Sequence, residues 1–546
     1  MHHTRCGLGL MLALALAACG TTPTPPQRPA GWGAPEALVA PSSFTGVHGL
    51  AVDARGRLLA GSVVGNAIWE VDRTSGAAKI LVGGPEGQAD DIAIGPKGEM
   101  AWTNYLMGMV RMRDSDTAPM RVVAKDLPGL NSLDFDRRNG KLYASQVFLG
   151  DALWELDPAG VKAPRQIAKD LGGFNGFEVG PDGMLYGPLW FKNSVVRIDP
   201  ANGAVTVINR EFKTPAAANL DGKGNLYVVD TATGELARVE LATGRKAVVA
   251  TLKPALDNLA VASDGTVYVS NMADNSIEAY NPATGAVRVL TSGKLAVPSG
   301  VKVAGNTLWV ADIFAFRSVN LATGAVTDVK RMHATDSDME YPFAVGVSSK
   351  QIAISSWFTG WVQVLDRATQ KTIANLHGWN APYDVLPMED GSLLVAEIAP
   401  GSITQASGAD YKTRRVVTSG LAGPVQMALG RDGALYVTEA AGRLTRVNLA
   451  DGTKTEVASG LALPEGVAQT PWGSFIVAES AAGKLTEIDP ANGQRRTVAE
   501  RLPIGLSASP GLPPPGVATG VTVDAEGNIY FTADRNNALY RIRPQR

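Results

Sequence analysis

The sequence repeats itself about every forty residues from residue 36 to its end, and this period limits the folds that the chain can adopt. Each unit holds short apolar stretches separated by turns, and most units have a glycine at the end of the first turn. These marker glycines are Gly56, Gly98, Gly140, Gly183, Gly224, Gly265, Gly305, Gly391, Gly433, Gly473 and Gly527. One more unit lies between Gly305 and Gly391, with the glycine-free turn Ser348-Ser349-Lys350, which makes twelve units.

A period of about 40 to 45 residues with four short strands is typical of a β-propeller blade. Helical repeats of similar length would need apolar residues at helical spacing, which this sequence lacks. A sandwich of unrelated strands would not explain the constant period. The pattern therefore predicts an all-β protein with twelve four-stranded repeats. Two tandem six-bladed β-propellers, at residues 36–285 and 286–546, are favoured over one twelve-bladed ring.

The phase of the repeats predicts how the rings close. The last unit ends with a third strand at Leu539–Ile542, and an apolar stretch at Glu36–Ala40 precedes the first full unit. Ala286–Leu290 stands in the corresponding place before the seventh unit. A strand donated to an incomplete blade removes an open sheet edge. We therefore expect each ring to be closed by a fourth strand from its own N-terminal end.

The first 35 residues have the pattern of an export signal. An apolar core at Leu8–Leu16 follows a short cationic start, and residues 1–18 fit a cleavable signal peptide. Leu16-Ala17-Ala18-Cys19 resembles the bacterial lipobox, which implies lipidation of Cys19 and an extracytoplasmic protein. In a Gram-negative organism the pattern implies the outer membrane, on either face. Residues 19–35, rich in Pro and Thr, would form a tether. An ordinary signal peptide with an incidental cysteine is the alternative.

Composition excludes several function classes. The formal net charge of −2 and a pI near 6.3 give no basic surface for nucleic acid. Cys6 and Cys19 are the only cysteines, and neither would be free after processing, so thiol catalysis and disulfides are not expected. No nucleophile-elbow or phosphate-loop pattern is present.

Polar residues recur where the innermost strand of each first-ring blade would begin. These positions, eight residues before each marker glycine or nine in the third unit, are His48, Asp90, Asn131, Asn175, Ala216 and Asp257. Strand starts of one ring converge at one mouth of its channel, so five polar side chains are expected to face each other there. Carboxylate and amide oxygens suit a hard cation such as Ca²⁺. A channel that is merely wet is the alternative.

Three segments around these positions resemble a known family. They are Leu130-Asn131-Ser132-Leu133-Asp134-Phe135-Asp136, Phe174-Asn175-Gly176-Phe177 and Leu256-Asp257-Asn258-Leu259. They are similar to the metal-binding segments of the six-bladed gluconolactonase, senescence-marker-protein and strictosidine-synthase family. The chain resembles virginiamycin B lyase and NHL-repeat proteins more loosely.

The resemblance implies a divalent metal, expected to be Ca²⁺, held by Asn131, Asn175 and Asp257. It also implies lactone hydrolysis, with Asp90 or His48 assisting. Two positions depart from the family pattern: His48 stands where the family has a glutamate, and Ala216 stands where an aspartate is expected.

The second ring carries acids at its predicted strand ends and starts. This second-ring acidic cluster is Asp312, Glu397, Glu439, Glu465 and Glu479. Facing carboxylates would collect a cation, whereas acids that bond backbone amides inside their own blade would not. Aromatic residues Trp357 and Phe358 could stack on a flat ligand or pack between blades. The Pro-rich segment at Leu502–Ala518 could be a lid over the second ring or a spacer.

Two functions remain open from the sequence. One is a lipid-anchored, gluconolactonase-like protein that binds or hydrolyses a small molecule with a divalent metal in the first ring; as an enzyme it would be a metal-dependent hydrolase or lyase. The other is a non-catalytic scaffold that binds a protein or glycan at the cell envelope. In both cases we expect a monomer that meets the membrane through its lipid anchor only.

Overall fold

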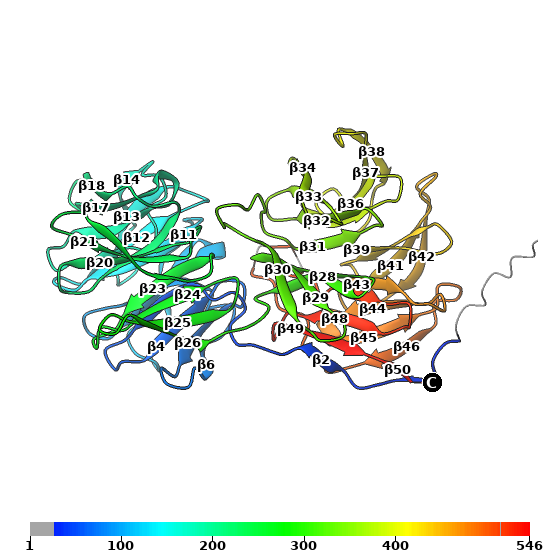
Figure 1. Cartoon of the computed structure of the whole chain (residues 1–546), viewed down its shortest axis with the longest axis horizontal. Coiled ribbons are helices and arrows are strands. Elements are labelled where there is room, and N and C mark those ends of the chain that lie inside the picture. The colour runs from blue at the N-terminus through cyan, green and yellow to red at the C-terminus, as the bar shows by residue number, and fades with distance from the viewer. Residues whose placement is uncertain (1–26, 511, 514, 546) are drawn as a thin grey trace, which may run out of the picture.

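The computed structural model describes residues 27–510, 512–513 and 515–545, and nearly all of its regular structure is β-strand. Twelve sheets have four antiparallel strands each, and they form two separate lobes (Figure 1). The predicted fold class is therefore confirmed. Cys19 and the signal segment lie outside the described residues, so lipidation stays a prediction.

The first ring consists of six blades, each made of four strands that follow one another in the sequence. Its sheets are β3–β4–β5–β6 (Leu50–Val52, Leu58–Ser62, Ala67–Val71, Ala78–Val82), β7–β8–β9–β10 (Ala89–Ile94, Met100–Asn104, Met109–Arg113, Arg121–Ala124), β11–β12–β13–β14 (Leu130–Asp136, Lys141–Gln146, Ala152–Leu156, Arg165–Lys169), β15–β16–β17–β18 (Glu178–Val179, Leu185–Leu189, Ser194–Ile198, Val205–Asn209), β19–β20–β21–β22 (Pro215–Leu220, Asn225–Asp230, Glu235–Glu240, Lys246–Thr251) and β23–β24–β25–β26 (Leu256–Val261, Val267–Asn271, Ser276–Asn281, Ala286–Thr291).

The second ring also has six blades, but its last blade takes one strand from the N-terminus. Its sheets are β27–β28–β29–β30 (Pro298–Ala304, Thr307–Asp312, Ala315–Asn320, Val326–Arg331), β31–β32–β33–β34 (Ala344–Val347, Gln351–Ser356, Trp361–Asp366, Thr372–Leu376), β35–β36–β37–β38 (Pro382–Pro387, Leu393–Glu397, Ser402–Ser407, Thr413–Thr418), β39–β40–β41–β42 (Pro424–Leu429, Leu435–Glu439, Arg443–Val447, Lys454–Ser459), β43–β44–β45–β46 (Pro464–Gln469, Phe475–Glu479, Lys484–Ile488, Arg495–Ala499) and β47–β48–β49–β2 (Val521–Val523, Ile529–Ala533, Ala538–Ile542, Glu36–Val39).

A few short elements lie outside the blades. β1 (Gly31–Trp32) pairs with β50 (Pro544–Gln545) beside the last blade, so the two ends of the described chain lie together on the second ring. Single 3₁₀ turns, η1 (Tyr105–Met107), η2 (Trp190–Lys192) and η3 (Ser480–Ala482), connect second to third strands. In the part of the chain that the structure describes, no helix is long and apolar enough to cross a membrane.

Both rings are closed circles of blades. In the first ring the innermost strands β23 and β3 contact each other, and the Ser270 hydroxyl donates to the His48 carbonyl over 2.6 Å. In the second ring β27 contacts β47 and β48, and the Thr532 hydroxyl donates to the Ser299 carbonyl, also over 2.6 Å. Each hydroxyl links the second strand of one blade to the start of the next blade, which fixes the spacing of blades at the channel.

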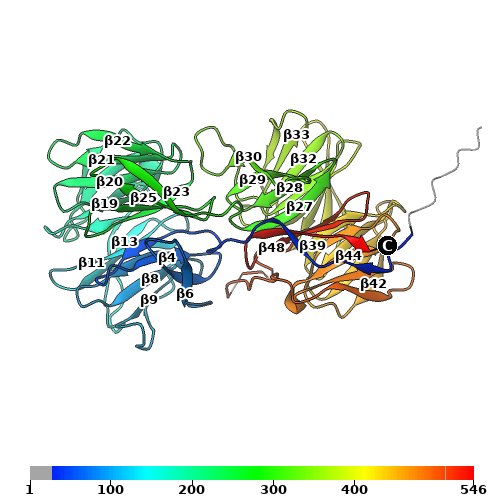
Figure 2. The same cartoon turned by 60° about the horizontal axis from the view of Figure 1, so that its bottom comes forward.

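The structure corrects the predicted domain boundaries and the closure of the first ring. Ala286–Thr291 is the fourth strand of the sixth blade and pairs with β25, so the first ring spans residues 50–291 and contains all of its own strands. Glu36–Val39 pairs with β49 in the last blade of the second ring. The first ring is therefore inserted between the closing strand and the rest of the second ring. Figure 2 shows the N-terminal segment running along the second ring before it enters the first.

Local sequence explains this outcome. A short turn ending at Gly285, whose φ is 72°, joins β25 to β26. Because the turn is short, this hairpin forms with little loss of loop entropy. The marker glycines all lie in the left-handed region, with φ between 61° and 100°, which residues with a side chain rarely adopt. The edge of β49 has no neighbour that follows it in sequence, so β2 is the strand left to fill it.

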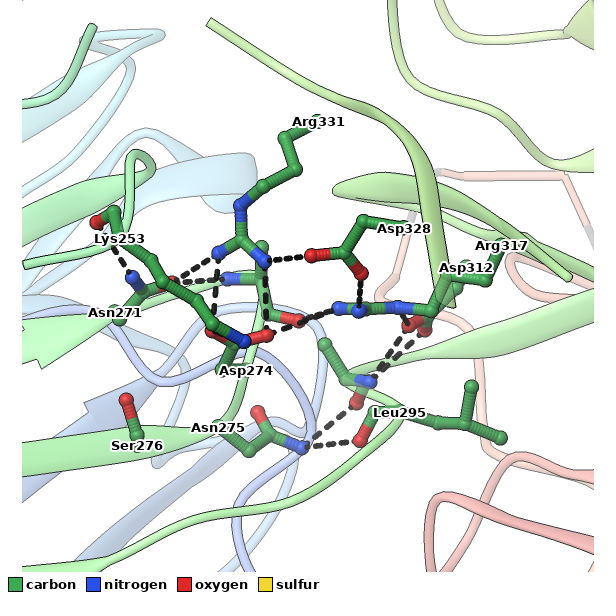
Figure 3. Close-up of polar contacts among 12 residues, drawn as sticks. Lys253, Asn271, Asp274, Asn275, Ser276, Leu295, Asp312, Arg317, Asp328 and Arg331 are labelled. Atoms are coloured by element: carbon green, nitrogen blue, oxygen red, sulfur yellow. Dashed lines mark hydrogen bonds and ion pairs between the residues drawn. The ribbon is translucent and has the colours of Figure 1, made fainter. Parts of the chain in front are cut away.

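Buried charges fasten the two rings together (Figure 3). Asp274 of the first ring accepts Arg331 Nη1 at 3.0 Å and Arg331 Nη2 at 3.1 Å, and it lies 3.3 Å from Arg317 Nη2. Arg317 also binds Asp312 through Nε at 2.7 Å and contacts Asp328. Burial alone would raise the pKa of Asp274, but the guanidinium of Arg331, with that of Arg317, holds this pKa below its usual range. The rings are thus joined by a network rather than by one exposed ion pair.

Candidate functional site

A cavity of about 140 Å³ lies between the two rings. Its floor is the mouth of the first ring's channel, where the innermost strands begin. Its walls and roof come from second-ring loops around Tyr341 and Trp357 and from residues 506–509, 512, 516 and 517. All five polar residues that were predicted to meet in the first ring line this floor: His48, Asp90, Asn131, Asn175 and Asp257.

His48, Asp90 and Asp257 form the tightest group on the floor. His48 Nδ1 lies 3.2 Å from Asp90 Oδ1 and 3.3 Å from Asp257 Oδ2. One ligand atom from each residue can be chosen so that all three atoms lie within 4.8 Å of one another. Among the described residues, no other group of three or more His, Cys, Asp or Glu side chains has this geometry. Nδ1 of the buried His48 ring thus faces the two carboxylates without hydrogen-bond geometry, and Nε2 has no hydrogen-bond partner in the described part of the chain.

Burial and mutual charge set the protonation of this group. Burial raises the pKa of Asp90 to about 7, although nearby His48 lowers it. Burial by itself would lower the pKa of His48, but the carboxylates of Asp257 and Asp90 outweigh it, so this pKa lies above its ordinary value. His48 and Asp90 therefore hold protons more tightly than usual, and a bound cation would displace them.

Asn131 and Asn175 line the same floor beside this group. Asn175 Oδ1 accepts the Gly176 amide at 3.0 Å and the Ser132 hydroxyl at 3.0 Å. Asn131 Oδ1 lies 2.9 Å from the same hydroxyl. Their amide oxygens therefore already have partners in the protein, and their NH₂ groups remain to serve a ligand oxygen. Coordination of a metal by these two residues stays a prediction.

The second-ring acidic cluster does not form either. Asp312, Glu397, Glu439 and Glu479 each accept backbone N–H groups from the loop before the first strand of their own blade. Glu397, Glu439 and Glu479 also accept threonine hydroxyls from the third strand. A carboxylate at the end of a second strand thus satisfies the amides of the entering loop. This is the structural alternative that the sequence had left open, and it corrects the expectation of a cation site there.

Glu465 differs from the other four acids because it lies on an innermost strand. Its Oε2 accepts the Thr519 amide at 2.6 Å and its Oε1 accepts the Ser480 hydroxyl at 2.6 Å. Burial, reinforced by the nearby charge of Asp534, raises the pKa of Glu465 to about 8. It therefore binds the start of the last blade as a protonated acid at neutral pH.

Sequence reasoning missed a row of acids deeper in the first ring. Asp91 accepts the Leu133 amide at 3.2 Å, and Asp134 accepts the Val179 amide at 2.8 Å. Glu178 continues the row by accepting the Leu220 amide at 2.6 Å. Each carboxyl group reaches the innermost strand of the next blade, so the row ties neighbouring blades together. Their spacing of 43 and 44 residues matches the repeat, which is the signal that could have identified them.

Asp134 provides a test of these links through pH. Burial, with the nearby charge of Glu178, raises the pKa of Asp134 to about 7. Because the folded protein binds this proton more tightly than the unfolded chain, stability contributed by Asp134 is lost as pH rises from about 4 to 7. We expect Asp134→Asn to be more stabilising at pH 8 than at pH 5, by about 2 kcal/mol. Urea unfolding at the two pH values measures this difference.

Asp136 on the same strand is the control for that experiment. Hydrogen bonds from Arg138 lower the pKa of Asp136, so its stabilising effect is present above its unfolded pKa and is lost in acid. Both pH 5 and pH 8 lie above the unfolded pKa of Asp136, so Asp136→Asn should destabilise the protein about equally at the two pH values. A change between pH 5 and pH 8 as large in Asp136→Asn as in Asp134→Asn would contradict the assignment of a protonated Asp134.

The chain has low similarity to known proteins, and its fold is shown by its own sheets. No family model and no curated protein matches the chain. Among solved structures, a streptogramin B lyase is 12% identical with a TM-score of 0.32, covering 68% of this chain and 93% of its own. Virginiamycin B lyase from Staphylococcus aureus is 13% identical with a TM-score of 0.31, and the match covers 60% of this chain and 94% of the lyase chain. A chain of the nidogen/laminin complex is 16% identical with a TM-score of 0.25, and the match covers 42% of this chain and 91% of that chain. The fold is a β-propeller, and the gluconolactonase-like assignment stays a prediction.

The Pro-rich segment also has a place that the sequence did not reveal. Ser509 Oγ donates to Asn66 Oδ1 at 3.0 Å, and Asn66 Nδ2 donates to the Ser507 carbonyl at 3.3 Å. On its other side the Trp357 indole donates to the Gly516 carbonyl at 3.0 Å. The segment therefore bridges the two rings and covers the first-ring floor. Its unusual length within the repeat was visible in the sequence, but its position over the other ring was not.

Proposed function

We propose that the protein binds a small molecule in the cavity between the rings and hydrolyses an ester or lactone bond there, with a divalent cation held by His48, Asp90 and Asp257. The observation that carries this proposal is the convergence of these three side chains at the floor of a covered cavity. Polar groups gathered in the deepest part of an otherwise apolar cavity are characteristic of ligand sites.

The residues present fit a divalent cation. One imidazole nitrogen and two carboxylates can supply three ligands, and the buried Nε2 of His48 has no hydrogen-bond partner among the described residues. Ca²⁺, the ion expected from the sequence, prefers oxygen ligands. An imidazole ligand favours Zn²⁺ or another transition metal instead. We therefore place Zn²⁺ and Mn²⁺ ahead of Ca²⁺ as candidates.

The surrounding residues suit hydrolysis of a carbonyl compound. A bound divalent cation supplies Lewis acidity and lowers the pKa of water at the site. Asn175, whose amide oxygen is engaged by Gly176 and Ser132, presents its NH₂ group and would orient the substrate carbonyl. Burial, with the charge of Asp90, raises the pKa of the Tyr105 hydroxyl, which therefore stays protonated as a donor. Residues 506–509, 512, 516 and 517 cover part of the cavity and would reduce the access of bulk water.

Metal binding is the experiment that tests the proposal. Isothermal titration of metal-free protein with Zn²⁺, Mn²⁺ and Ca²⁺ should reveal one site. Asp257→Asn keeps the side-chain volume but removes a charged ligand. Loss of a residue that only supports a metal ligand lowers metal affinity by roughly 10- to 100-fold, so we expect the metal affinity of Asp257→Asn to fall by at least this factor. Asp90→Asn should have a similar effect.

Asp91→Asn is the matched control. Asp91 is adjacent in sequence to Asp90 and equally buried, but its carboxylate is bound to backbone amides and to Asn258 rather than to the group of three. Metal affinity should be unchanged in this variant. Absence of a site in the wild type, or an equal loss in Asp91→Asn, would contradict the proposal. A site without hydrolysis of any lactone would instead favour the non-catalytic binding protein.

We further propose that the protein is an extracytoplasmic lipoprotein anchored through Cys19. The described chain begins beside the second ring, where Arg28 Nε lies 2.9 Å from Glu487 Oε1. The ring centroid of Trp32 lies 5.7 Å from that of Trp472 on the same ring of blades, with the two indoles tilted by 43°. An anchor at Cys19 would therefore hold the protein to the membrane through its second ring. Mass spectrometry for a diacylglyceryl group on Cys19 tests this localisation.

A further inference from the structure

The cavity between the rings has aromatic walls that only the second ring can complete. Trp190 of the first ring lies 5.2 Å, between ring centroids, from His333 of the second. His333 lies 6.4 Å from Tyr341, and Tyr341 lies 5.4 Å from Phe358. These distances are typical of interacting aromatic rings. The side chains form a continuous aromatic row that crosses from one ring to the other beside the polar floor.

Part of this aromatic surface is left open to solvent. Phe148 and Phe358 both line the cavity, yet they are 43% and 37% exposed. Large exposed apolar side chains grouped at the rim of a cavity mark a binding surface. Phe148 also has a φ of 68°, a left-handed conformation that a bulky residue seldom adopts. Strained residues of this kind concentrate at ligand sites, where surrounding structure maintains them.

The size of the cavity limits what can enter. A volume of about 140 Å³ is close to the roughly 150 Å³ of an engineered apolar cavity that accepts benzene. One aromatic ring therefore fits between the walls, whereas a large macrocycle does not. At the floor, the NH₂ group of Asn175 and the hydroxyl of Tyr105 are donors suited to a carbonyl oxygen.

From this combination we infer that the aromatic wall shared by the two rings determines substrate specificity, by selecting flat aromatic molecules whose carbonyl group reaches the first-ring floor. Benzo-fused lactones and aryl esters have this chemistry. The inference rests on the proposed function, because it assumes a carbonyl ligand at the group of His48, Asp90 and Asp257. It assigns to Tyr341, Phe358 and Phe148 a role in recognition that neither ring could provide alone.

A matched pair of probes tests the inference by binding rather than turnover. Dihydrocoumarin and δ-valerolactone share the same lactone ring, but only dihydrocoumarin carries a fused benzene ring. Trp190 and Trp357 line the cavity, so intrinsic fluorescence can report both titrations. We expect the wild type to bind dihydrocoumarin about 10- to 100-fold more tightly, from burial of the added ring.

Two variants remove aromatic walls without threatening the fold. Phe148→Gly deletes one ring at a position where its φ of 68° suits glycine, and Phe358→Ser changes a side chain that is already 37% exposed. Each should reduce the preference for dihydrocoumarin several-fold. Ile80→Ala is the control, since Ile80 is 57% exposed on β6 and does not line the cavity; it should keep the wild-type preference.

The outcomes separate this inference from the proposed function. Equal affinity for the two lactones, no binding of either, or an unchanged preference in both wall variants would overturn the aromatic selectivity. Metal titration of the same proteins provides the second readout. An intact metal site without aromatic preference would leave the proposed function standing alone. Aromatic preference without a metal site would refute the metal-assisted chemistry while retaining the aromatic wall as a binding surface.

Discussion

Deletion of residues 27–40 is expected to destabilise the second ring severely while leaving the blades of the first ring protected. The deletion removes β2, which pairs with β49 through Glu36–Arg541, Ala37–Tyr540 and Val39–Leu539. Val39 is 1% exposed and packs with Leu539 in the core between the last and first blades of this ring. Loss of this burial and of the strand's hydrogen bonds amounts to about 5 kcal/mol. For a domain of this size, that lowers Tm by about 10 to 20 °C.

Hydrogen–deuterium exchange localises this effect along the chain. Amides of β47–β49 and β27 should lose protection, because β49 becomes an open edge and the ring is no longer closed. Amides of β3–β26 should keep theirs. Deletion of residues 27–33 is the matched control, since it removes β1 but keeps β2, and its effect should be much smaller. Loss of protection in β26 rather than β49 would contradict the strand assignment.

Asp274→Ala is expected to make the two rings unfold in separate transitions. Asp274 is the first-ring carboxylate that binds Arg331 and contacts Arg317, and Arg317 is 2% exposed. Removing one partner of a buried ion pair leaves charge that the protein no longer balances, which costs about 3 to 5 kcal/mol. The cooperative unfolding of two joined rings should then divide into two transitions. Differential scanning calorimetry detects this division directly.

Asp264→Ala provides the control with the same chemical change. Asp264 pairs with Arg73 within the first ring, and its side chain is 54% exposed. Exposed ion pairs contribute about 0 to 1 kcal/mol, so this variant should unfold like the wild type. An equal effect of the two substitutions would mean that the network in Figure 3 does not fasten the rings. The joint also matters for function, because the inter-ring cavity exists only while the rings stay together.

Much of the candidate site could be predicted from the repeat. Counting back from the marker glycines placed His48, Asp90 and Asp257 at one mouth of one channel, and the structure brings these three together. The position in the repeat could not distinguish these three residues from Asn175. Asn175 has the same place in its blade, but its amide oxygen accepts a hydrogen bond from the Gly176 amide. Hydrogen-bond partners depend on neighbouring blades, and the position of a residue in the repeat does not reveal them.

The acids of the second ring show the limit of the same reasoning. Glu397, Glu439 and Glu479 occupy equivalent places, and each accepts a backbone amide 17 residues earlier in the sequence. The regular recurrence of these acids was visible in the sequence, and it indicates a link repeated from blade to blade rather than a single site. A repeated acid is therefore evidence for blade structure, whereas His48 occurs once and is evidence for a site.

The blade, the number of blades and the polar mouth of the first ring could be predicted from the amino-acid sequence alone. These features follow from local rules: strand length, glycine turns with positive φ, and a fixed period. The closure of the second ring by β2 depends on the tertiary structure, and so does the covering of the first-ring floor by Tyr341, Phe358 and residues 506–509, 512, 516 and 517. Both are contacts between residues far apart in the chain. Their free energy depends on which edge and which surface remain unpaired once the blades have formed, and no local pattern records that.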